Sequence, residues 1–403
     1  MNLYSLGMSL FMVGAAPFYA LRVIKGKYRS SFKKRMGSDL AIIPETETGS
    51  IWIHACSVGE VEAAVPLVEY IKGKKTDCSI IISTVTETGQ ARAQALFPDS
   101  HVRYLPFDFE KCIHRHFENA GKITHFIILE TEIWPNLINE LAKRDIPIFI
   151  ANGRISDKTW PNYRRFGLVF EPIMKKIRAV GARTEIDAQR FRTIGASRVV
   201  NVGNIKFDRK EPEILSELPK GKFIFFASTH PGEDEICLRI FNNLKIDFPE
   251  LRAVIAPRHT ERATGISNIV PSSLRSKGWG DEEILILDTH GELAGMYAMA
   301  EAAFIGGSFV PIGGHNPLEP AILGVSTLWG PHFANFKDAC GLLDGHGGFL
   351  CETPEECTKQ FARLLGDREY AISEGQKAKE VVLSNRGATE KTWQLFFEEE
   401  VKN

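Results

Sequence analysis

The sequence predicts an α/β protein made of two doubly wound units that follow one another along the chain. Short runs rich in Ile and Val alternate with helix-like stretches from residue 50 to about 205, and this alternation restarts at residue 223. Between them, Phe207 to Lys222 is rich in Lys, Glu and Pro, which is typical of an interdomain linker. With 403 residues, 44% of them hydrophobic, the chain is long enough to bury two cores.

Most of the predicted strands are continuous apolar runs, as expected for strands that helices cover on both faces. In the first unit they are Ser50–Cys56, Ser79–Val85, Val102–Pro106, Thr124–Glu130, Pro147–Gly153, Ile177–Arg183 and Val199–Asn204. In the second unit they are Phe223–Thr229, Leu251–Arg258, Ile284–His290, Glu301–Gly307 and Val325–Gly330, and helices follow from about Pro354. Ligands of such sheets bind at the carboxyl ends of the strands, so we expect the functional side chains there, in a cleft between the units.

The beginning of the chain has the charge pattern of a membrane-attached segment. Leu3 to Leu21 carry no charge, and residues 22–35 contain basic side chains but no acid. The uncharged stretch is close to the roughly 20 residues that span a bilayer, and the basic side is expected to be cytoplasmic. A cleaved signal peptide would carry its positive charge before the apolar stretch. A helix lying in the membrane interface is the alternative to a spanning one.

Composition excludes several classes of protein. The net charge of −1 gives the whole molecule no strong attraction to nucleic acid, and we expect no nucleic-acid partner. Seven cysteines without a C-x-x-C pair are typical of a reducing cytoplasm rather than of a disulfide framework. The histidines lack H-E-x-x-H or Cys/His spacing, so no metal site is expected. Phosphate-loop and nucleophile-elbow motifs are also absent from the sequence.

The stretch from Gly306 to Gly324 predicts a buried strand end, a glycine-rich loop and a helix with a well-defined start. Asn316 suits the N-cap, Pro317 the first helical position, and Glu319 the acidic position of a capping box. The loop glycines leave backbone N–H groups and the helix dipole free to face a phosphate, while Glu319 reaches a sugar hydroxyl. A well-capped turn without a ligand explains the same residues equally well.

Glu60 follows the first predicted strand and has two interpretations. Ser57-x-x-Glu60 forms a capping box, which would make the carboxylate a structural feature of the helix start. A carboxylate at the mouth of a cleft is also suited to accept a proton from a substrate hydroxyl. Capping is the more common role, and local sequence leaves both open.

Charged residues at other strand ends are further candidates. Glu130 ends an apolar strand, where an ionised acid needs a compensating cation, and Lys206 is a possible partner. Arg258 follows another strand, and its guanidinium group suits a phosphate or a carboxylate. The alternatives are a structural ion pair for Glu130 and Lys206, and an ordinary surface arginine for Arg258.

Taken together, these motifs resemble the 3-deoxy-D-manno-octulosonic acid (Kdo) transferases, which attach Kdo to the lipid A precursor. The resemblance covers nearly the whole chain, including the basic N-terminal segment. Two motifs depart slightly from the family pattern, at Thr229-His-Pro-Gly232 and His259-Thr-Glu261. The strings that carry the resemblance are Ile51–Glu60, Glu130–Asn136, Asn152–Ser156, Gly203–Asp208, Pro257–Arg262 and Gly306–Glu319.

The resemblance implies a GT-B glycosyltransferase with two Rossmann-like domains, CMP-Kdo as donor, a lipid A precursor as acceptor and no cofactor. It implies a membrane anchor and basic segment in 1–35, an acceptor-side domain in 36–208, a linker in 209–222 and a donor-binding domain in 223–403. The location implied is the cytoplasmic face of the cell inner membrane.

The resemblance also implies a role for each candidate residue. Glu60 becomes the catalytic base of an inverting transfer, and Glu130 and Lys206 stabilise the transition state. The residues expected to bind CMP-Kdo are Pro257, Arg258, His290, Gly291, Glu292, Asn316, Pro317, Leu318 and Glu319. The alternatives are a GT-B enzyme that uses a UDP-sugar, such as a lipid-linked glycosyltransferase or a 2-epimerase, and a catalytically silent, membrane-tethered nucleotide-binding protein.

Overall fold

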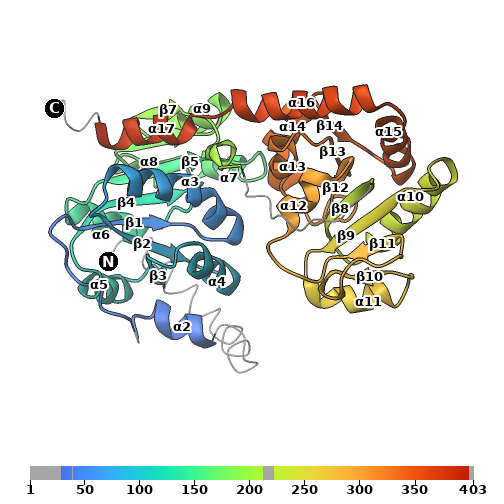
Figure 1. Ribbon diagram of the computed structural model, residues 1–403. Coiled ribbons are helices and arrows are strands. Elements are labelled where there is room, and N and C mark those ends of the chain that lie inside the picture. The colour runs from blue at the N-terminus through green and yellow to red at the C-terminus, as the bar shows by residue number, and fades with distance from the viewer. Residues whose placement is uncertain (1–28, 39, 212–221, 399–403) are drawn as a thin grey trace. The chain divides into compact units, whose positions relative to one another are not determined.

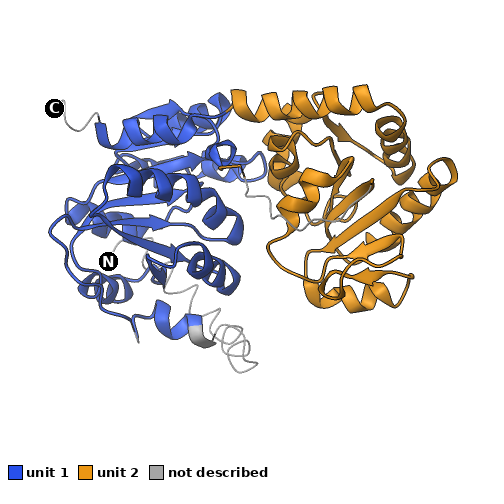
Figure 2. Cartoon of the chain, in the orientation of Figure 1, with its two compact units in different colours: residues 1–209, 386–403 blue, residues 210–385 orange. Residues whose placement is uncertain are grey.

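The computed structural model of the protein describes residues 29–38, 40–211 and 222–398, which fold as two compact units (Figures 1 and 2). The predicted apolar membrane segment, Leu3 to Leu21, lies outside the described residues. In the described ranges, no helix combines the length and apolar character needed to cross a membrane. The membrane anchor therefore stays a prediction.

Unit 1 contains a seven-stranded parallel sheet in the order β3-β2-β1-β4-β5-β6-β7. The interior strand β1 is buried on both faces: Ile51 and Ile53 face one apolar cluster, and Trp52 faces the other. The strands are β1 (Ser50–His54), β2 (Ser79–Thr84), β3 (His101–Tyr104), β4 (Ile123–Leu129), β5 (Ile148–Gly153), β6 (Ala179–Ala182) and β7 (Val199–Asn201). The helices are α2 (Arg29–Arg35), α3 (Val58–Lys74), α4 (Glu87–Leu96), α5 (Glu110–Glu118), α6 (Pro135–Lys143), α7 (Trp160–Arg165), α8 (Gly167–Met174), α9 (Glu185–Thr193) and α17 (Ala388–Trp393).

Unit 2 contains a second seven-stranded parallel sheet, in the order β10-β11-β9-β8-β12-β13-β14. The strands are β8 (Phe223–Thr229), β9 (Arg252–Pro257), β10 (Ser273–Leu274), β11 (Ile284–Ile286), β12 (Ala302–Ile305), β13 (Thr327–Trp329) and β14 (Gly348–Leu350). The helices are α10 (Asp234–Asp247), α11 (Ala263–Ser267), α12 (Leu293–Met299), α13 (Leu318–Ile322), α14 (Lys337–Leu343), α15 (Pro354–Gly366) and α16 (Arg368–Ser384).

The predicted strands are confirmed, with differences of a few residues at their ends. Prediction missed the two edge strands of the second sheet, β10 and β14, which are two and three residues long. Such short strands have too few residues to show a hydrophobic period. Both sheets have helices between successive strands, as expected for doubly wound units.

The end of the chain corrects one predicted boundary. Residues 223–403 were expected to form one domain, but the chain from Arg386 onward belongs to unit 1. Asp208 accepts hydrogen bonds from the backbone N–H groups of Gly387 and Thr389, at 2.6 and 2.5 Å. Trp393 and Phe396 add their rings to an apolar cluster beneath the first sheet. The apolar contacts that hold this segment are distant in sequence, so the local helix pattern could not assign it to a unit.

Candidate active site

Glu60 lies in the first turn of α3, just after the carboxyl end of β1. Its Oε2 accepts a hydrogen bond from the backbone N–H of Cys56 at 2.6 Å, and the Ser57 hydroxyl donates to Oε1 at 3.1 Å. Ser57 is the N-cap residue, but its side chain makes no capping bond to the helix. The predicted capping box is therefore not formed: Glu60 accepts from the N–H of Cys56, one residue before the N-cap, and the Ser57 hydroxyl orients the carboxyl group of Glu60.

The pKa of Glu60 is raised from 4.5 to about 8. Burial is the largest cause, and the neighbouring charge of Glu130 adds to it, while the hydrogen bond from Cys56 opposes the rise. Glu132 raises the pKa further. A carboxyl group with a pKa close to neutral can take up and release a proton near the working pH, which is the property required of a general acid or base.

Glu130 follows β4 and has a left-handed backbone, with φ of 58°. Its Oε1 lies 3.0 Å from Lys206 Nζ and 3.7 Å from Arg183 Nη1. Burial alone would raise the pKa of Glu130, but the charges of Lys206 and Arg183 outweigh it, and the pKa is lowered. The predicted pair of Glu130 and Lys206 is thus formed. Neighbouring carboxyl groups are held in different protonation states, Glu130 ionised and Glu60 largely protonated at neutral pH.

Arg183 and Asn152 also belong to this site; Asn152 lies in one of the predicted strand-end motifs, whereas Arg183 was given no role by the sequence analysis. Arg183 follows β6, and its side chain is only 2% exposed beside Glu130. Asn152, buried at the end of β5 with φ of 55°, accepts a hydrogen bond from the backbone N–H of Ile205 at 3.2 Å and so positions the turn that carries Lys206. The position of Arg183 at a strand carboxyl end was the signal that could have identified it.

Cys56 is next to Glu60 but is not suited to nucleophilic chemistry. Burial raises the pKa of its thiol, and the charges of Glu132 and Glu60 raise it further. The reactive form of cysteine is the thiolate, and this environment disfavours it. The chemistry of this site therefore belongs to its carboxyl groups and their basic partners.

In unit 2, a buried carboxylate changes the interpretation of the glycine-rich loop. Glu233 is fully buried and accepts hydrogen bonds from the backbone N–H groups of Gly307, Ser308 and Phe309 at 2.6 to 2.9 Å. It also accepts one from the N–H of His230 at 2.9 Å. Because Glu233 occupies them, the N–H groups of Gly307, Ser308 and Phe309 do not face a phosphate. A phosphate site formed by the rest of the loop and the start of the helix stays a prediction.

The loop glycines instead allow close packing. A side chain at Gly306 would place its Cβ 2.4 Å from the carbonyl oxygen of Ser228, and one at Gly313 would meet the Asn335 side chain at 2.7 Å. Gly307 has φ of 69°, where L-residues are strained, and a Cβ there would press against the rings of His315 and His230. Steric limits thus explain three of these glycines without a ligand.

The predicted helix start is confirmed to within one residue. The helix α13 begins at Leu318, and Asn316 Oδ1 accepts a hydrogen bond from the Leu318 N–H at 3.1 Å. Asn316 Nδ2 donates to Glu319 Oε1 at 3.2 Å. Pro317 directly precedes the helix. This polar cluster caps the helix, so Asn316 and Glu319 have a structural role whether or not a sugar binds them.

Several predicted donor-binding residues lie at the carboxyl ends of strands in unit 2. Pro257 ends β9, and Arg258 is exposed directly after it. The Nε2 atoms of His230 and His315 are 2.8 Å apart. Burial lowers the pKa of both histidines, that of His315 to about 3, and the charge of Arg258 adds to the lowering. The strand-end loops therefore bring a guanidinium group close to a pair of neutral imidazole rings.

The remaining predicted residues lie before α12. The His290 ring and the Thr260 hydroxyl are 3.3 Å apart, which links this loop to the one that contains Arg258. Gly291 has φ of 87°. Glu292 Oε2 accepts a hydrogen bond from Arg275 Nε at 2.6 Å, so its charge is paired within unit 2. Of the proposed donor ligands, Arg258 offers the most accessible positive charge.

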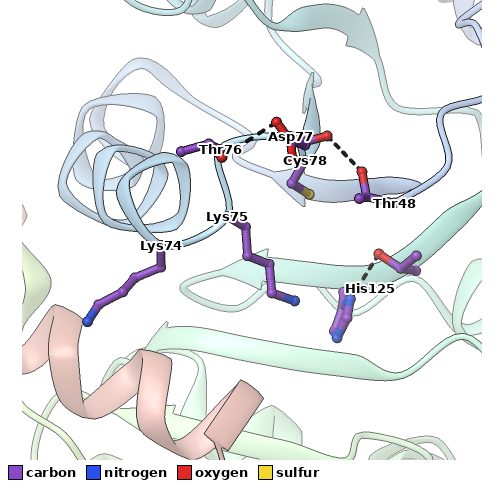
Figure 3. A pocket seen from close by; sticks show the side chains of 8 residues that line it. Thr48, Lys74, Lys75, Thr76, Asp77, Cys78 and His125 are labelled. Atoms are coloured by element: carbon purple, nitrogen blue, oxygen red, sulfur yellow. Dashed lines mark hydrogen bonds between the residues drawn. The ribbon is translucent and has the colours of Figure 1, made fainter.

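A cavity of about 460 Å³ lies in unit 1 at the amino edge of the sheet (Figure 3), and Glu60 is not among the residues that line it. Lys75 points into it, and its Nζ lies 4.6 Å from the centre of the Phe397 ring. Thr124, at the start of β4, is also part of its lining. Because doubly wound sheets bind ligands at the opposite, carboxyl edge, this cavity is separate from the candidate active site.

Comparison with known proteins gives a consistent result. A family model described as 3-deoxy-D-manno-octulosonic-acid transferase (kdotransferase) matches residues 30–209. The 3-deoxy-D-manno-octulosonic acid transferase of Haemophilus influenzae is 33% identical over 399 residues and covers 93% of each chain.

Solved structures also resemble the chain. The crystal structure of a UDP-N-acetylglucosamine 2-epimerase covers 90% of this chain and 96% of its own, with a TM-score of 0.58 at 12% identity, which indicates a shared fold. The C-terminal CMP-Kdo binding domain of WaaA from Acinetobacter baumannii is 26% identical, covers 40% of this chain and 89% of its own, and has a TM-score of 0.38.

Proposed function

The chain belongs to the Kdo transferase family and is a glycosyltransferase that transfers Kdo, and from this premise we propose the donor, the acceptor and the base of its reaction. The donor is CMP-Kdo, the acceptor is the lipid A precursor lipid IV-A, and Glu60 is the general base. The reaction takes place at the cytoplasmic face of the inner membrane, with residues 1–35 as the attachment.

The observation that supports the role of Glu60 as base is the pair of buried carboxyl groups at one edge of the sheet, one of them paired with Lys206 and Arg183 and the other not. Glu60 has a pKa of about 8, whereas the pKa of Glu130 is lowered. Ionised Glu60 would accept the proton of an acceptor hydroxyl as that oxygen attacks the anomeric carbon of Kdo. The bond to the CMP phosphate then breaks on the opposite side, and the configuration inverts.

Glu130 and Lys206 support the charge that develops during this reaction. The sugar ring becomes cation-like as the phosphate leaves, and a carboxylate kept ionised by Lys206 and Arg183 stabilises such a ring. In unit 2, Arg258 is the proposed partner of the phosphate, because its guanidinium group is exposed and forked. The loop N–H groups that Glu233 occupies are left out of this role.

The test is a transfer assay with CMP-Kdo made in situ and a tetraacylated lipid A precursor, read as product mass. We expect a gain in mass of one Kdo for each transfer. A matched reaction with UDP-sugars in place of CMP-Kdo should give no product. Transfer from a UDP-sugar, or no transfer from CMP-Kdo by well-folded protein, would reject the proposed donor. The arginine is tested by Arg258→Ala, which should raise KM for CMP-Kdo more than the nearby exposed variant Glu261→Ala.

A further inference from the structure

The cavity at the amino edge of the first sheet contains two lysine side chains that no carboxylate neutralises. It has a volume of about 460 Å³, and Lys74 and Lys75, at the end of α3, are part of its lining. In the ranges that the structure describes, neither lysine forms an ion pair. Small-molecule sites occupy roughly 300 to 1,000 Å³, so the cavity is large enough for one. We call it the α3 cavity.

Aromatic rings hold the two ammonium groups in place. Lys75 points into the α3 cavity, and its Nζ lies 4.6 Å from the centre of the Phe397 ring and 5.8 Å from that of the Trp393 ring (Figure 3). Lys74 Nζ lies 5.5 Å from the centre of the Tyr70 ring. A ring face attracts an ammonium group but accepts few of its hydrogen bonds. The N–H donors of both lysines are therefore open to a ligand.

The direction of Lys75 is not explained by the helix dipole. Basic residues in the last turn of a helix complement its partial negative charge, and Lys72 and Lys74 of α3 have that position. Lys75 follows the last turn, is partly buried and points into the cavity. A cation directed inward beside an open cavity is suited to bind an anion.

Hydroxyl groups contribute most of the remaining polar lining. Thr48, Thr76 and Thr124 line the α3 cavity, and Thr124 Oγ1 is 3.0 Å from His125 Nδ1. Asp77 is the one acid among the described residues that line it, and its Oδ1 is 3.5 Å from Thr76 Oγ1. Two lysines and one aspartate leave a formal positive charge on the lining. The cavity therefore favours a negatively charged ligand.

The donor set favours a phosphate group over a carboxylate. A phosphate monoester carries about −1.5 to −2 charges at neutral pH, which two neighbouring ammonium groups can balance. Lysine binds phosphate as a point charge, whereas carboxylates are matched by the fork of an arginine, and no arginine lines the α3 cavity. A free phosphate ion would fill only a small part of the cavity. We therefore expect a phosphate group with an organic part attached.

The α3 cavity is distinct from the candidate active site, although both involve α3. Glu60 is in the first turn of this helix and Lys74 is its last residue, which places them about 21 Å apart along the helix axis. Trp393 and Phe397 belong to the segment that returns to unit 1 after Arg386. A ligand bound to Lys75 would thus join the end of α3 to this returning segment.

We propose that the α3 cavity is a second binding site of the protein, for a small molecule that carries a phosphate monoester. Lys74 and Lys75 bind the phosphate group, and the organic part fills the rest of the cavity beside Thr124. This site is additional to the one at the carboxyl ends of the strands. It does not rest on the proposed donor, acceptor or base.

The test uses the full chain and pyridoxal 5′-phosphate, whose aldehyde forms an imine with a lysine amine and releases water. Borohydride reduces the imine, and peptide mass spectrometry gives the rate at each lysine. We expect labelling at Lys74 or Lys75 about tenfold faster than at exposed Lys111 on α5, and suppressed by inorganic pyrophosphate. Pyridoxal, which lacks the phosphate, should show no such preference. Equal rates at the three lysines, or labelling that pyrophosphate does not slow, would overturn the proposal.

The thiol of Cys78, which lines the α3 cavity, provides an independent measurement. Pyrophosphate should slow its alkylation by N-ethylmaleimide severalfold in wild type and leave the alkylation of Cys56 unchanged. The protection should be lost in Lys75→Met, which keeps the length of the side chain, and kept in Lys72→Met, a control on the same helix outside the lining.

Two results of this measurement would contradict the proposal. Equal slowing at Cys56 and Cys78 would show a general effect of the anion on the protein. Protection of Cys78 that persists in Lys75→Met would remove Lys75 from the site. Equal Tm values of the two variants and wild type establish that the variants are folded, and the labelling of wild type by pyridoxal 5′-phosphate needs no variant.

Discussion

Replacing Glu60 with glutamine tests the proposed base while keeping the shape of the side chain. The glutamine carbonyl oxygen can still accept the hydrogen bond that Cys56 N–H donates to Glu60 at 2.6 Å. The variant loses the ability to take up a proton, and the Ser57 hydroxyl then faces an amide NH2 group in place of Oε1. A positioned general base contributes about 10² to 10⁴ in rate, so we expect Glu60→Gln to lose at least about a hundredfold in kcat/KM.

The pH dependence gives a sharper expectation. With a pKa of about 8, only about a tenth of Glu60 is ionised at pH 7. The wild-type kcat/KM should therefore rise about tenfold from pH 6 to pH 7 and level off above pH 8. The residual activity of Glu60→Gln should lack this rise. The measurement is product mass against time at subsaturating acceptor, from pH 5.5 to 9.

Stability provides an independent measurement with a defined sign. Folded Glu60 keeps its proton up to about pH 8, whereas the unfolded chain releases it near pH 4.5, so its contribution to stability falls as pH rises through this window. Glu60→Gln removes this loss, and the variant should gain on the order of 2 to 4 kcal/mol relative to wild type between pH 5 and pH 9, after allowance for solvent screening.

The proposed role of Glu60 as base would be refuted by results that show a mainly structural, capping role. In that case Glu60→Gln would lower Tm by a similar amount at every pH and would retain most of the transfer activity. A wild-type rate that does not change between pH 6 and pH 8 would likewise remove Glu60 from the role of base. The matched control is Glu62→Gln, two residues along the same helix, which should leave the rate and its pH profile unchanged.

Three further variants test the supporting contacts. Glu233→Ala leaves four backbone N–H groups without their acceptor and should destabilise unit 2 by about 3 to 5 kcal/mol in urea unfolding. The control is the exposed Glu235→Ala, and a loss of similar size in that variant would refute the role of Glu233. Lys206→Met should raise the pKa of Glu130 and lower the free energy of unfolding by about 2 kcal/mol. An unchanged titration of the Glu130 carboxyl group, followed by NMR, would disprove the pairing. Asp208→Ala removes the hydrogen bonds to the N–H groups of Gly387 and Thr389 and should expose the chain near Arg386 to proteolysis. A cleavage rate equal to that of wild type would show that these hydrogen bonds do not hold the segment.

The strands show how much of the fold could be predicted from sequence. β1 and β4 are continuous apolar runs because both of their faces are buried, and that pattern is visible without a structure. The helix start at Leu318 was predictable because capping depends on residues within one turn. The edge strand β10 was not predictable, since two residues carry no period.

The candidate site was predictable in its residues but not in its electrostatics. Glu60, Glu130 and Lys206 could be proposed because they follow predicted strands and match the family motifs. Their protonation states could not be, because the pKa of Glu60 depends on burial and on Glu130, which is 70 residues away in the chain. Arg183 was missed for the same reason, as its contact with Glu130 exists only when β4 and β6 share one sheet.

The sequence by itself therefore determined the α/β class, the two units, the position of the strand-end residues and the family. These properties depend on local patterns of apolar residues and on short motifs. Only the tertiary structure decided that Glu233, rather than a phosphate, occupies the N–H groups of the glycine loop, and that the chain returns to unit 1 after Arg386. The physical reason is that a buried carboxylate must find donors wherever the fold places them, and these donors lie more than 70 residues away.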